Sequence, residues 1–289
     1  MLGTKAQILS KAQEVGLSRI LAEIDQLIES SIRLYPSYID ETQIPLGSSK
    51  IGGMPDLPRS IEWPSWESGP MSFIGQVRVS EVKAHDSEGV LPARGLLYFF
   101  YDCEQTAWGY LPAHGEGCKV FYFDGPDTEL ARTEFPSDLP TGSRYSPCAV
   151  RPSREDTLAH IDSLLTEELD LTPQERESYW NLLEAVEPPP WPATAHRLLG
   201  HPDQIQGDMQ LECQLASNGI DVGGGAGYRD PRAPSLRQGA RDWRLLFQVD
   251  SEENAGMGWG DSGRVYFWIK SQDLEQRDFE RVWPVLQCG

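Results

Sequence analysis

Three aspartates in this sequence stand in stretches that could carry out acid–base chemistry: Asp208, Asp250 and Asp261. Carboxylates that line a cleft can take up or release a proton during hydrolysis. Two of them also fit structural roles. Asp208 suits the first turn of a helix, and Asp261 lies in a Gly-Asp-Ser-Gly turn, where Asp accepts backbone hydrogen bonds. The sequence favours these structural roles over a catalytic one.

Other catalytic patterns are missing from the sequence. It contains no Gly-x-Ser-x-Gly motif and no cysteine and histidine spaced as a nucleophile and its base. The glycine-rich run 223–227 lacks the Gly-Lys-Ser/Thr ending of a phosphate-binding loop, so it predicts an exposed loop. His114 and Cys118 lie four residues apart, but no second ligand pair accompanies them. We therefore expect no catalytic residues, no metal and no cofactor.

The charge balance narrows the choice of partner. The 289 residues include 25 Lys and Arg against 44 Asp and Glu, which gives a formal net charge of −19. This charge repels the phosphates of nucleic acids and anionic membrane surfaces, so we expect direct binding to neither. It attracts a cationic protein and accelerates the encounter with it. Solubility alone is the alternative explanation.

Composition also indicates where the protein resides. No run approaches the roughly 20 apolar residues that cross a bilayer, and the first residues do not resemble a secretory signal. The five cysteines are odd in number and form no Cys-x-x-Cys pair, which favours reduced thiols. We expect a cytoplasmic protein that is monomeric on its own.

Local patterns predict an α+β fold in one compact body with four segments. Gly and Pro punctuate short aromatic and β-branched runs in the strand-rich parts, whereas apolar residues recur with helical spacing elsewhere. The expected segments are an N-terminal helical segment (1–42), a first β-rich repeat (43–152), a helical insertion with a proline-rich connector (153–192) and a second α/β repeat (193–289).

Element boundaries follow from caps and breakers. Helix is expected from Thr4 to Ser31, from Ser153 to Glu187 and from Asp208 to Gly219, with Thr172 and Glu175 forming a capping box. The expected strands are Met71–Val79, Gly95–Tyr101, Lys119–Phe123, Cys148–Arg151, Trp243–Val249, Arg264–Lys270 and Arg281–Gln287.

The two halves share three local patterns in the same order, which predicts an internal duplication of two related mixed or antiparallel β units. The patterns are a turn of Gly-x-Pro type, a strand with Gln-Val and a Gly-led aromatic strand. They occupy Ile51–Pro55, Phe73–Val77 and Gly95–Phe100 in the first half, and Leu199–Pro202, Leu246–Val249 and Gly263–Trp268 in the second. Gln76 and Gln248 lie within apolar runs, so each either braces a turn or faces a cleft, and bracing is favoured.

These stretches also carry a family resemblance. The runs Ile51–Pro55, Ile61–Pro64, Phe73–Gln76 and Leu91–Gly95, followed by His201–Asp208, Gln248–Ser251 and Trp259–Gly263, are similar to the YwqG-like bacterial proteins. The resemblance spans about 50–287. It implies an α+β fold with a duplication, no established activity and an association with bacterial toxin systems. The residues that carry it are Gly52, Gly53, Pro55, Gln76, Gly207, Asp208, Gln248, Asp250, Trp259, Gly260 and Asp261.

These observations favour a binding function over an enzymatic one. We expect an immunity (antitoxin) protein that neutralises a cationic bacterial toxin, most plausibly a nuclease effector, by direct contact. The expected contact residues are Glu167, Glu168, Asp170, Glu184, Glu187, Glu252 and Glu253.

Two alternatives depend on a cleft between the repeats. A hydrolase would use the carboxylates Asp208, Asp250 and Asp261 there. A module that binds a small ligand or a glycan would use exposed aromatic rings, with Trp63, Trp66 and Trp259 as candidates.

Overall fold

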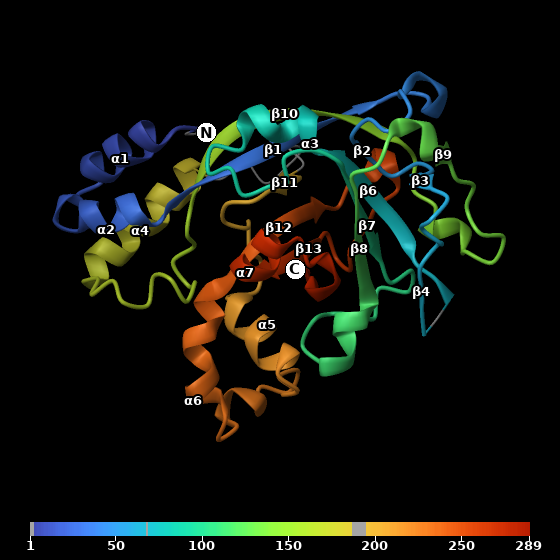
Figure 1. The fold of residues 1–289 in the computed structure, drawn as a ribbon. Coiled ribbons are helices and arrows are strands. Elements are labelled where there is room, and N and C mark those ends of the chain that lie inside the picture. Colours follow the sequence, from blue (N-terminus) through green and yellow to red (C-terminus); the bar gives the residue numbers. More distant parts are fainter. Residues whose placement is uncertain (1–2, 68, 187–194) are drawn as a thin grey trace.

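The computed structural model describes residues 3–67, 69–186 and 195–289. Its main element is an antiparallel sheet of ten strands in the order β14-β13-β12-β11-β1-β10-β2-β6-β7-β8, and β3-β9 and β4-β5 form two small sheets (Figure 1). The strands are β1 (Ile28–Tyr38), β2 (Lys50–Ile51), β3 (Asp56–Pro58), β4 (Ser65–Trp66), β5 (Gly69–Pro70), β6 (Ser72–Arg78), β7 (Leu96–Tyr101), β8 (Cys118–Phe123), β9 (Leu130–Arg132), β10 (Cys148–Leu158), β11 (Arg197–Leu198), β12 (Trp243–Asp250), β13 (Arg264–Lys270) and β14 (Trp283–Gln287). The helices are α1 (Lys5–Glu14), α2 (Leu21–Gln26), α3 (Val79–Val82), α4 (Pro173–Val186), α5 (Gln210–Ser217), α6 (Ala233–Leu236) and α7 (Ser271–Gln276).

The two longest strands, β1 and β10, pair at the centre of the sheet along their whole length. Beyond β10 follow β2, β6, β7 and β8, and beyond β1 follow β11, β12, β13 and β14. The outer edges approach each other, because Trp283 Nε1 donates to Gly109 O (2.9 Å) and Leu286 N donates to Trp108 O (3.1 Å). The sheet is therefore nearly closed, with two arms that face each other.

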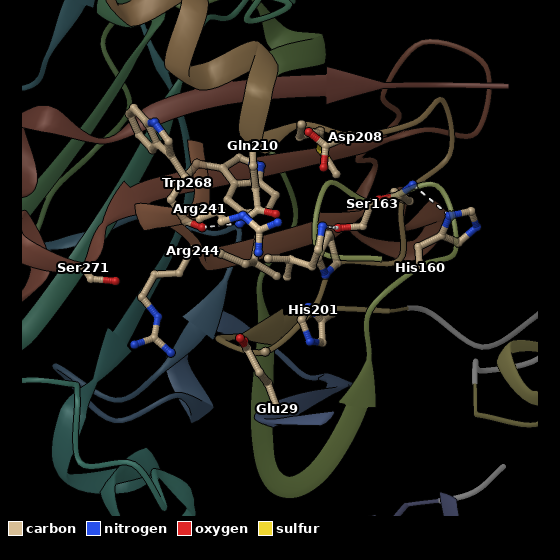
Figure 2. A pocket seen from close by; sticks show the side chains of 17 residues that line it. Glu29, His160, Ser163, His201, Asp208, Gln210, Arg241, Arg244, Trp268 and Ser271 are labelled. Atoms are coloured by element: carbon tan, nitrogen blue, oxygen red, sulfur yellow. Dashed lines mark hydrogen bonds between the residues drawn. The ribbon is translucent and has the colours of Figure 1, made fainter. Parts of the chain in front are cut away.

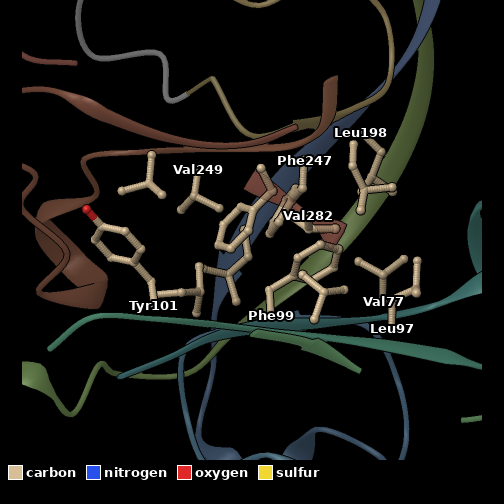
Figure 3. Close-up of a cluster of buried hydrophobic side chains, with 14 of the residues drawn as sticks. Val77, Leu97, Phe99, Tyr101, Leu198, Phe247, Val249 and Val282 are labelled. Carbon is tan, nitrogen blue, oxygen red and sulfur yellow. The ribbon is translucent and has the colours of Figure 1, made fainter. Parts of the chain in front are cut away.

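One central core fills the space between the arms (Figure 3). The ring of Phe99 on β7 lies 4.6 Å from that of Phe247 on β12 and 5.2 Å from that of Phe267 on β13. Alternate residues of β7 and β13 point to the outer faces and are buried there by a second layer. Burial on both faces explains why these strands are apolar throughout. The outward-facing residues include Tyr98, Phe100, Tyr266 and Trp268.

The outer faces of the arms have different covers. Over the β6–β8 arm lie the extended segments of β3, β4 and β9, and the ring of Trp63 lies 5.4 Å from that of Phe100. Over the β12–β14 arm lies α5, and its N-cap residue Met209 and its Cys213 pack against the arm's buried aromatic residues. We call these the first-arm cover and the second-arm cover.

The helices α1, α2 and α4 gather at one end of the β1–β10 ribbon (Figure 1). Apolar residues of α1, α2 and α4 form a separate cluster with the end of β10. Thr4 caps α1, and the predicted capping box is confirmed, since Thr172 Oγ1 accepts from Glu175 N (3.2 Å) and Glu175 Oε2 accepts from Thr172 N (2.9 Å). Among the described residues, no helix combines the length and the apolar character needed to cross a bilayer.

The predicted strands all occur, whereas two helical predictions are wrong. Helix was expected as far as Ser31, but β1 begins at Ile28. Helix was also expected from Ser153, but residues 153–158 complete β10. Ile32 and Leu34 reach the central core from β1, and the long β1–β10 pairing outweighs local helix propensity. Residue 187 and the proline-rich connector lie outside the described residues.

Candidate functional site

Gln76 is fully buried in β6 and holds the turn after β2. Its Oε1 accepts from Asp56 N (2.8 Å), and its Nε2 donates to Ser48 O (2.8 Å) and Asp56 Oδ2 (2.8 Å). The turn passes through Gly52 and Gly53 in left-handed conformation, with φ of +63° and +70°. All the polar atoms of the Gln76 side chain are thus used in bracing this turn.

Gln248 in β12 makes the same set of contacts in the second arm. Its Oε1 accepts from Asp203 N (2.9 Å), and its Nε2 donates to Ala195 O (2.5 Å) and Asp203 Oδ2 (3.0 Å). The turn again has two left-handed residues, Leu199 and Gly200, with φ of +60° and +69°. A leucine in this conformation is strained, so the surrounding contacts must hold it there.

A cation completes each bracing network. Lys50 Nζ lies 3.5 Å from Asp56 Oδ1, and an Arg197 guanidinium nitrogen lies 2.9 Å from Asp203 Oδ2. Burial opposes ionisation of both aspartates, but neighbouring lysine and arginine side chains hold the pKa of each below its usual value. We call Lys50, Asp56 and Gln76 the first brace, and Arg197, Asp203 and Gln248 the second brace.

Two further family-signature residues of the second half, Asp250 and Trp259, are held in structural contacts. Asp250 pairs with Arg264 (3.1 Å) and, on burial, has a raised pKa. Trp259 is fully buried and donates from Nε1 to Asp250 O (3.2 Å). Asp261 lies in an exposed turn next to Gly260, whose φ is +53°. The structure does not gather Asp208, Asp250 and Asp261 in one cavity, because only Asp208 lines the two cavities described below.

The tryptophans considered for glycan binding lie apart. The expectation for Trp259 is wrong, since its ring packs inside the core against Tyr101 and Tyr145. Trp63 and Trp66 are half-buried in the first-arm cover, where Trp63 Nε1 donates to Met71 O (2.9 Å). No shared aromatic platform results from these three rings.

The first cavity lies between the second-arm cover and the β1 end of the sheet (Figure 2) and has a volume of about 220 Å³. In the view of Figure 2, Glu29 and His201 lie below the centre, and Asp208 lies above it. The two arginines that line the cavity form ion pairs with exposed glutamates. Arg241 pairs with Glu168 (2.6 Å), and Arg244 pairs with Glu88 (2.8 Å).

Two polar atoms in the wall of this cavity have no hydrogen-bond partner among the described residues. They are His201 Nε2 and Trp268 Nε1, and both are shielded from solvent by the atoms around them. A ligand in the cavity would not reach them without rearrangement of the wall. The first cavity therefore has a polar lining but no accessible constellation that points to one chemistry.

The second cavity, with a volume of about 420 Å³, lies on the other side of Asp208. Asp208 accepts from Leu211 N (2.9 Å) and Leu164 N (2.8 Å), so it holds the first turn of α5, although the N-cap position itself is Met209. Glu212 follows one turn later on the same face of α5. The cavity is lined by Trp108, Tyr110, Gln206, Asp208, Leu211, Glu212, Tyr228, Leu286 and Gln287.

Both carboxyl groups that line this cavity have raised pKa values. Burial raises the pKa of Asp208, although its two backbone hydrogen bonds oppose the rise. Burial, together with the charge of Asp208, raises the pKa of Glu212 to about 7. Within the part of the chain that the structure describes, no Lys or Arg pairs with Glu212. A carboxylate in this state gains stabilisation from any cation that enters.

The predicted partner contacts differ in accessibility. Glu167, Glu168 and Asp170 are exposed in the turn before α4, and the first two pair with Arg237 and Arg241. The other expected contacts are Glu184 and Glu253, which are exposed, Glu187, which lies outside the described residues, and Glu252. The expectation for Glu252 is wrong, because its side chain is buried, where Oε1 accepts from Asn254 N (3.2 Å).

Among the residues that the structure describes, no three His, Cys, Asp or Glu side chains converge as they would around a metal ion. His114 Nδ1 accepts from the backbone N–H groups of Gly109 and Leu111. Burial raises the pKa of the Cys118 thiol well above its usual value. These two residues therefore serve the fold around the start of β8.

A family model for a domain of unknown function (DUF1963) matches residues 49–288. The chain belongs to this family. The match begins one residue before β2 and ends one residue after β14, so the DUF1963 region takes in both braces and both covers. No curated protein matches the chain.

The brace residues Lys50, Asp56, Arg197 and Asp203 and the cavity residue Glu212 were not expected from the sequence. A longer comparison of the halves could have found the first four, since each turn starts with a cation and ends in Pro-Asp six residues later. The sequence signal for Glu212 is weaker. It lies four residues after Asp208, a spacing that puts two side chains on the same face of a helix. Its cavity depends on distant segments that no local pattern predicts.

Proposed function

We propose that this DUF1963 protein acts by binding a basic partner protein, in the manner of an immunity protein that neutralises a cationic toxin of the nuclease class. The observation that carries this proposal is the distribution of charge. The net charge is −19, and the family-signature Gln and Asp residues are largely used in bracing contacts, whereas exposed carboxylates remain for a partner. A nuclease that grips a polyanion presents Lys and Arg, which such a surface complements.

The exposed carboxylates near α4 form the rim of this interaction. Glu167 and Glu168 are held only by exposed arginines, and exposed ion pairs contribute about 0–1 kcal/mol. A basic partner can replace these arginines at little cost. Asp170 and Glu184 lie in the same region and make no ion pair with described residues. Rim charges of this kind act mainly on the association rate.

Affinity capture from the native organism, with the intact protein as bait, tests the proposal. We expect one protein with a basic domain to be retained at low salt and released at high salt. The captured protein, made separately, should bind the bait with an association rate that falls steeply as salt rises. Failure to retain a basic protein, or a rate that does not respond to salt, would overturn the proposal.

A hydrolase or a protein that binds a small ligand is the second candidate, favoured by the shared cavity of Asp208 and Glu212. A carboxyl with a pKa of about 7 can donate a proton near neutral pH. The pair lies within the second-arm cover rather than between the halves. Turnover in a substrate panel that disappears in Glu212→Gln would establish this candidate and exclude a function by binding alone.

We also propose that the two arms descend from one duplicated unit and that this family and the YwqG-like proteins form one group. The sheet order, which repeats outward from the β1–β10 pair, supports the duplication. So do the two braces, which make the same hydrogen bonds, and the equivalent contacts Tyr98 Oη to Asp56 O and Tyr266 Oη to Asp203 O. Superposition of the two arms tests it. If the strands of the two arms superpose but the residues at the brace positions do not coincide, the duplication is contradicted.

A further inference from the structure

The strongest unassigned feature of the molecule is the second cavity, between α5 and the edge where β14 meets the segment before β8. We propose that this cavity is a binding site for an arginine side chain of the partner protein, held by Glu212 and Asp208 and by the rings of Trp108, Tyr110 and Tyr228. The inference rests on the proposed function for the source of the arginine. The cation site itself can be tested without the partner.

The first argument is the charge of the lining. Its ionisable residues are two carboxylates and two tyrosines, and no Lys or Arg lines it. Both oxygens of Asp208 already accept backbone hydrogen bonds, whereas the described residues offer Glu212 no hydrogen-bond or ion-pair partner. An entering guanidinium would be the missing partner, with charge-assisted hydrogen bonds that are about twice as strong as neutral ones.

The second argument is the aromatic wall. Three rings line the cavity, and Tyr228 is one of few large apolar side chains exposed at the surface, with 41% of its area accessible. A guanidinium plane stacks on such rings and gains cation–π energy, which an ammonium on a flexible stem does less well. The combination of carboxylates and rings therefore favours arginine over lysine.

The third argument concerns the source of the cation. The volume of about 420 Å³ falls in the range of small-ligand sites, about 300–1,000 Å³, and exceeds what one guanidinium needs. Free arginine carries its own carboxylate, which Asp208 and Glu212 would repel. An arginine within a peptide has no such group, and its neighbouring backbone can occupy the outer part of the cavity.

The site should respond to pH. The titratable groups that interact electrostatically with Glu212 are Asp208 from the preceding turn, the Tyr228 hydroxyl and the buried Cys213 thiol, while Glu167 and Arg237 act on Asp208. Tyr228 and Cys213 have raised pKa values and stay neutral near pH 7. Glu212 is therefore the group that must lose a proton when a cation binds. Affinity should rise from about pH 6 to about pH 8, with proton release.

Nuclear magnetic resonance with small probes tests the proposal on the full chain. We expect N-acetylarginine methylamide to shift the indole N–H signal of Trp108 and the signals of α5. The uncharged isostere N-acetylcitrulline methylamide should not do so, the lysine analogue should bind more weakly, and free arginine more weakly still. Binding of the citrulline analogue as tight as that of the arginine analogue would overturn the assignment.

Variants locate the site. Glu212→Gln should weaken binding of the arginine probe about tenfold and abolish its pH dependence. Glu275→Gln, an exposed residue with the same change of charge, should leave it unchanged. Tyr228→Ala offers a second disruption at the surface, where folding is not at risk. Equal binding by Glu212→Gln and the wild type would overturn the proposal. A probe that binds while no basic partner is captured would uphold the cation site and contradict only the proposed function.

Discussion

The two arms of the sheet share their braces but not their covers. In the first arm, β3, β4 and β9 lie over the sheet, and Trp63 packs on Phe100. In the second arm, α5 lies over the sheet, Asp208 lines both cavities and Glu212 lines the second. The same bracing contacts thus support one cover that completes the core and one that leaves room for a ligand. We infer that the matched residues maintain the fold and that the unmatched second-arm cover carries the function.

The braces should show the largest effect on stability. Gln76→Ala and Gln248→Ala each remove one hydrogen-bond donor from a buried aspartate and leave two backbone groups without their side-chain partner, at a cost of about 3 kcal/mol in the free energy of unfolding. Urea unfolding measures this cost. The two values should agree, while Gln206→Ala, at an exposed position, should change little. A large loss in one arm only would break the equivalence of the braces.

The second-arm cover should show a smaller and pH-dependent effect. Glu212 has a pKa of about 7 when folded against 4.5 ordinarily, so the unfolded chain ionises first as pH rises. The native state therefore loses stability between about pH 4.5 and pH 7, and the loss is complete above pH 7. Because the side chain is partly accessible, we expect about 2 kcal/mol.

Glu212→Gln should recover that stability above pH 7 and leave it unchanged near pH 4. Thermal unfolding across this range, alongside Glu275→Gln, measures the difference. If the stability of the wild type and that of Glu212→Gln change with pH in parallel, the pKa of Glu212 is not raised in the folded protein.

The rim charges should have the smallest effect on stability and act on binding instead. Neutralising Glu167, Glu168, Asp170 and Glu184 together should change the free energy of unfolding by about 1 kcal/mol or less and slow partner association about tenfold. A matched control removes four exposed charges from the first half of the chain, at Glu104, Glu129, Glu134 and Asp138. Equal slowing by both variants would indicate that only net charge matters and would contradict a localised rim.

The sequence predicts the local elements of this fold better than their partners. The aromatic strands β7 and β13 follow from their composition, and the start of α5 near Asp208 follows from that residue. The strand β1 was missed, because Leu27 and Ile28 fit a helical stripe while the pairing that makes residue 28 a strand residue lies on β10, far along the chain. Local patterns carry no information on such long-range pairing.

The candidate site was predictable only in part, for the same reason. Asp208 stands out in the sequence, and the glycine-rich run 223–227, which directly precedes Tyr228, was predicted as an exposed loop. These residues lie next to Trp108 only because β14 contacts the segment before β8. That contact forms when the sheet closes, and no local pattern predicts it. Glu252 was misassigned, since a charged residue in a turn reads as exposed unless its burial is known.

The footprint of the captured partner tests the central claim most directly. Hydrogen exchange of the intact protein, alone and in the complex, locates the protected backbone. We predict protection over 160–171, 206–215 and 224–230, which surround the second cavity and the rim, with no change over 56–66 and 124–138 in the first-arm cover. Protection centred on the first-arm cover, with the α5 region unchanged, would contradict the account.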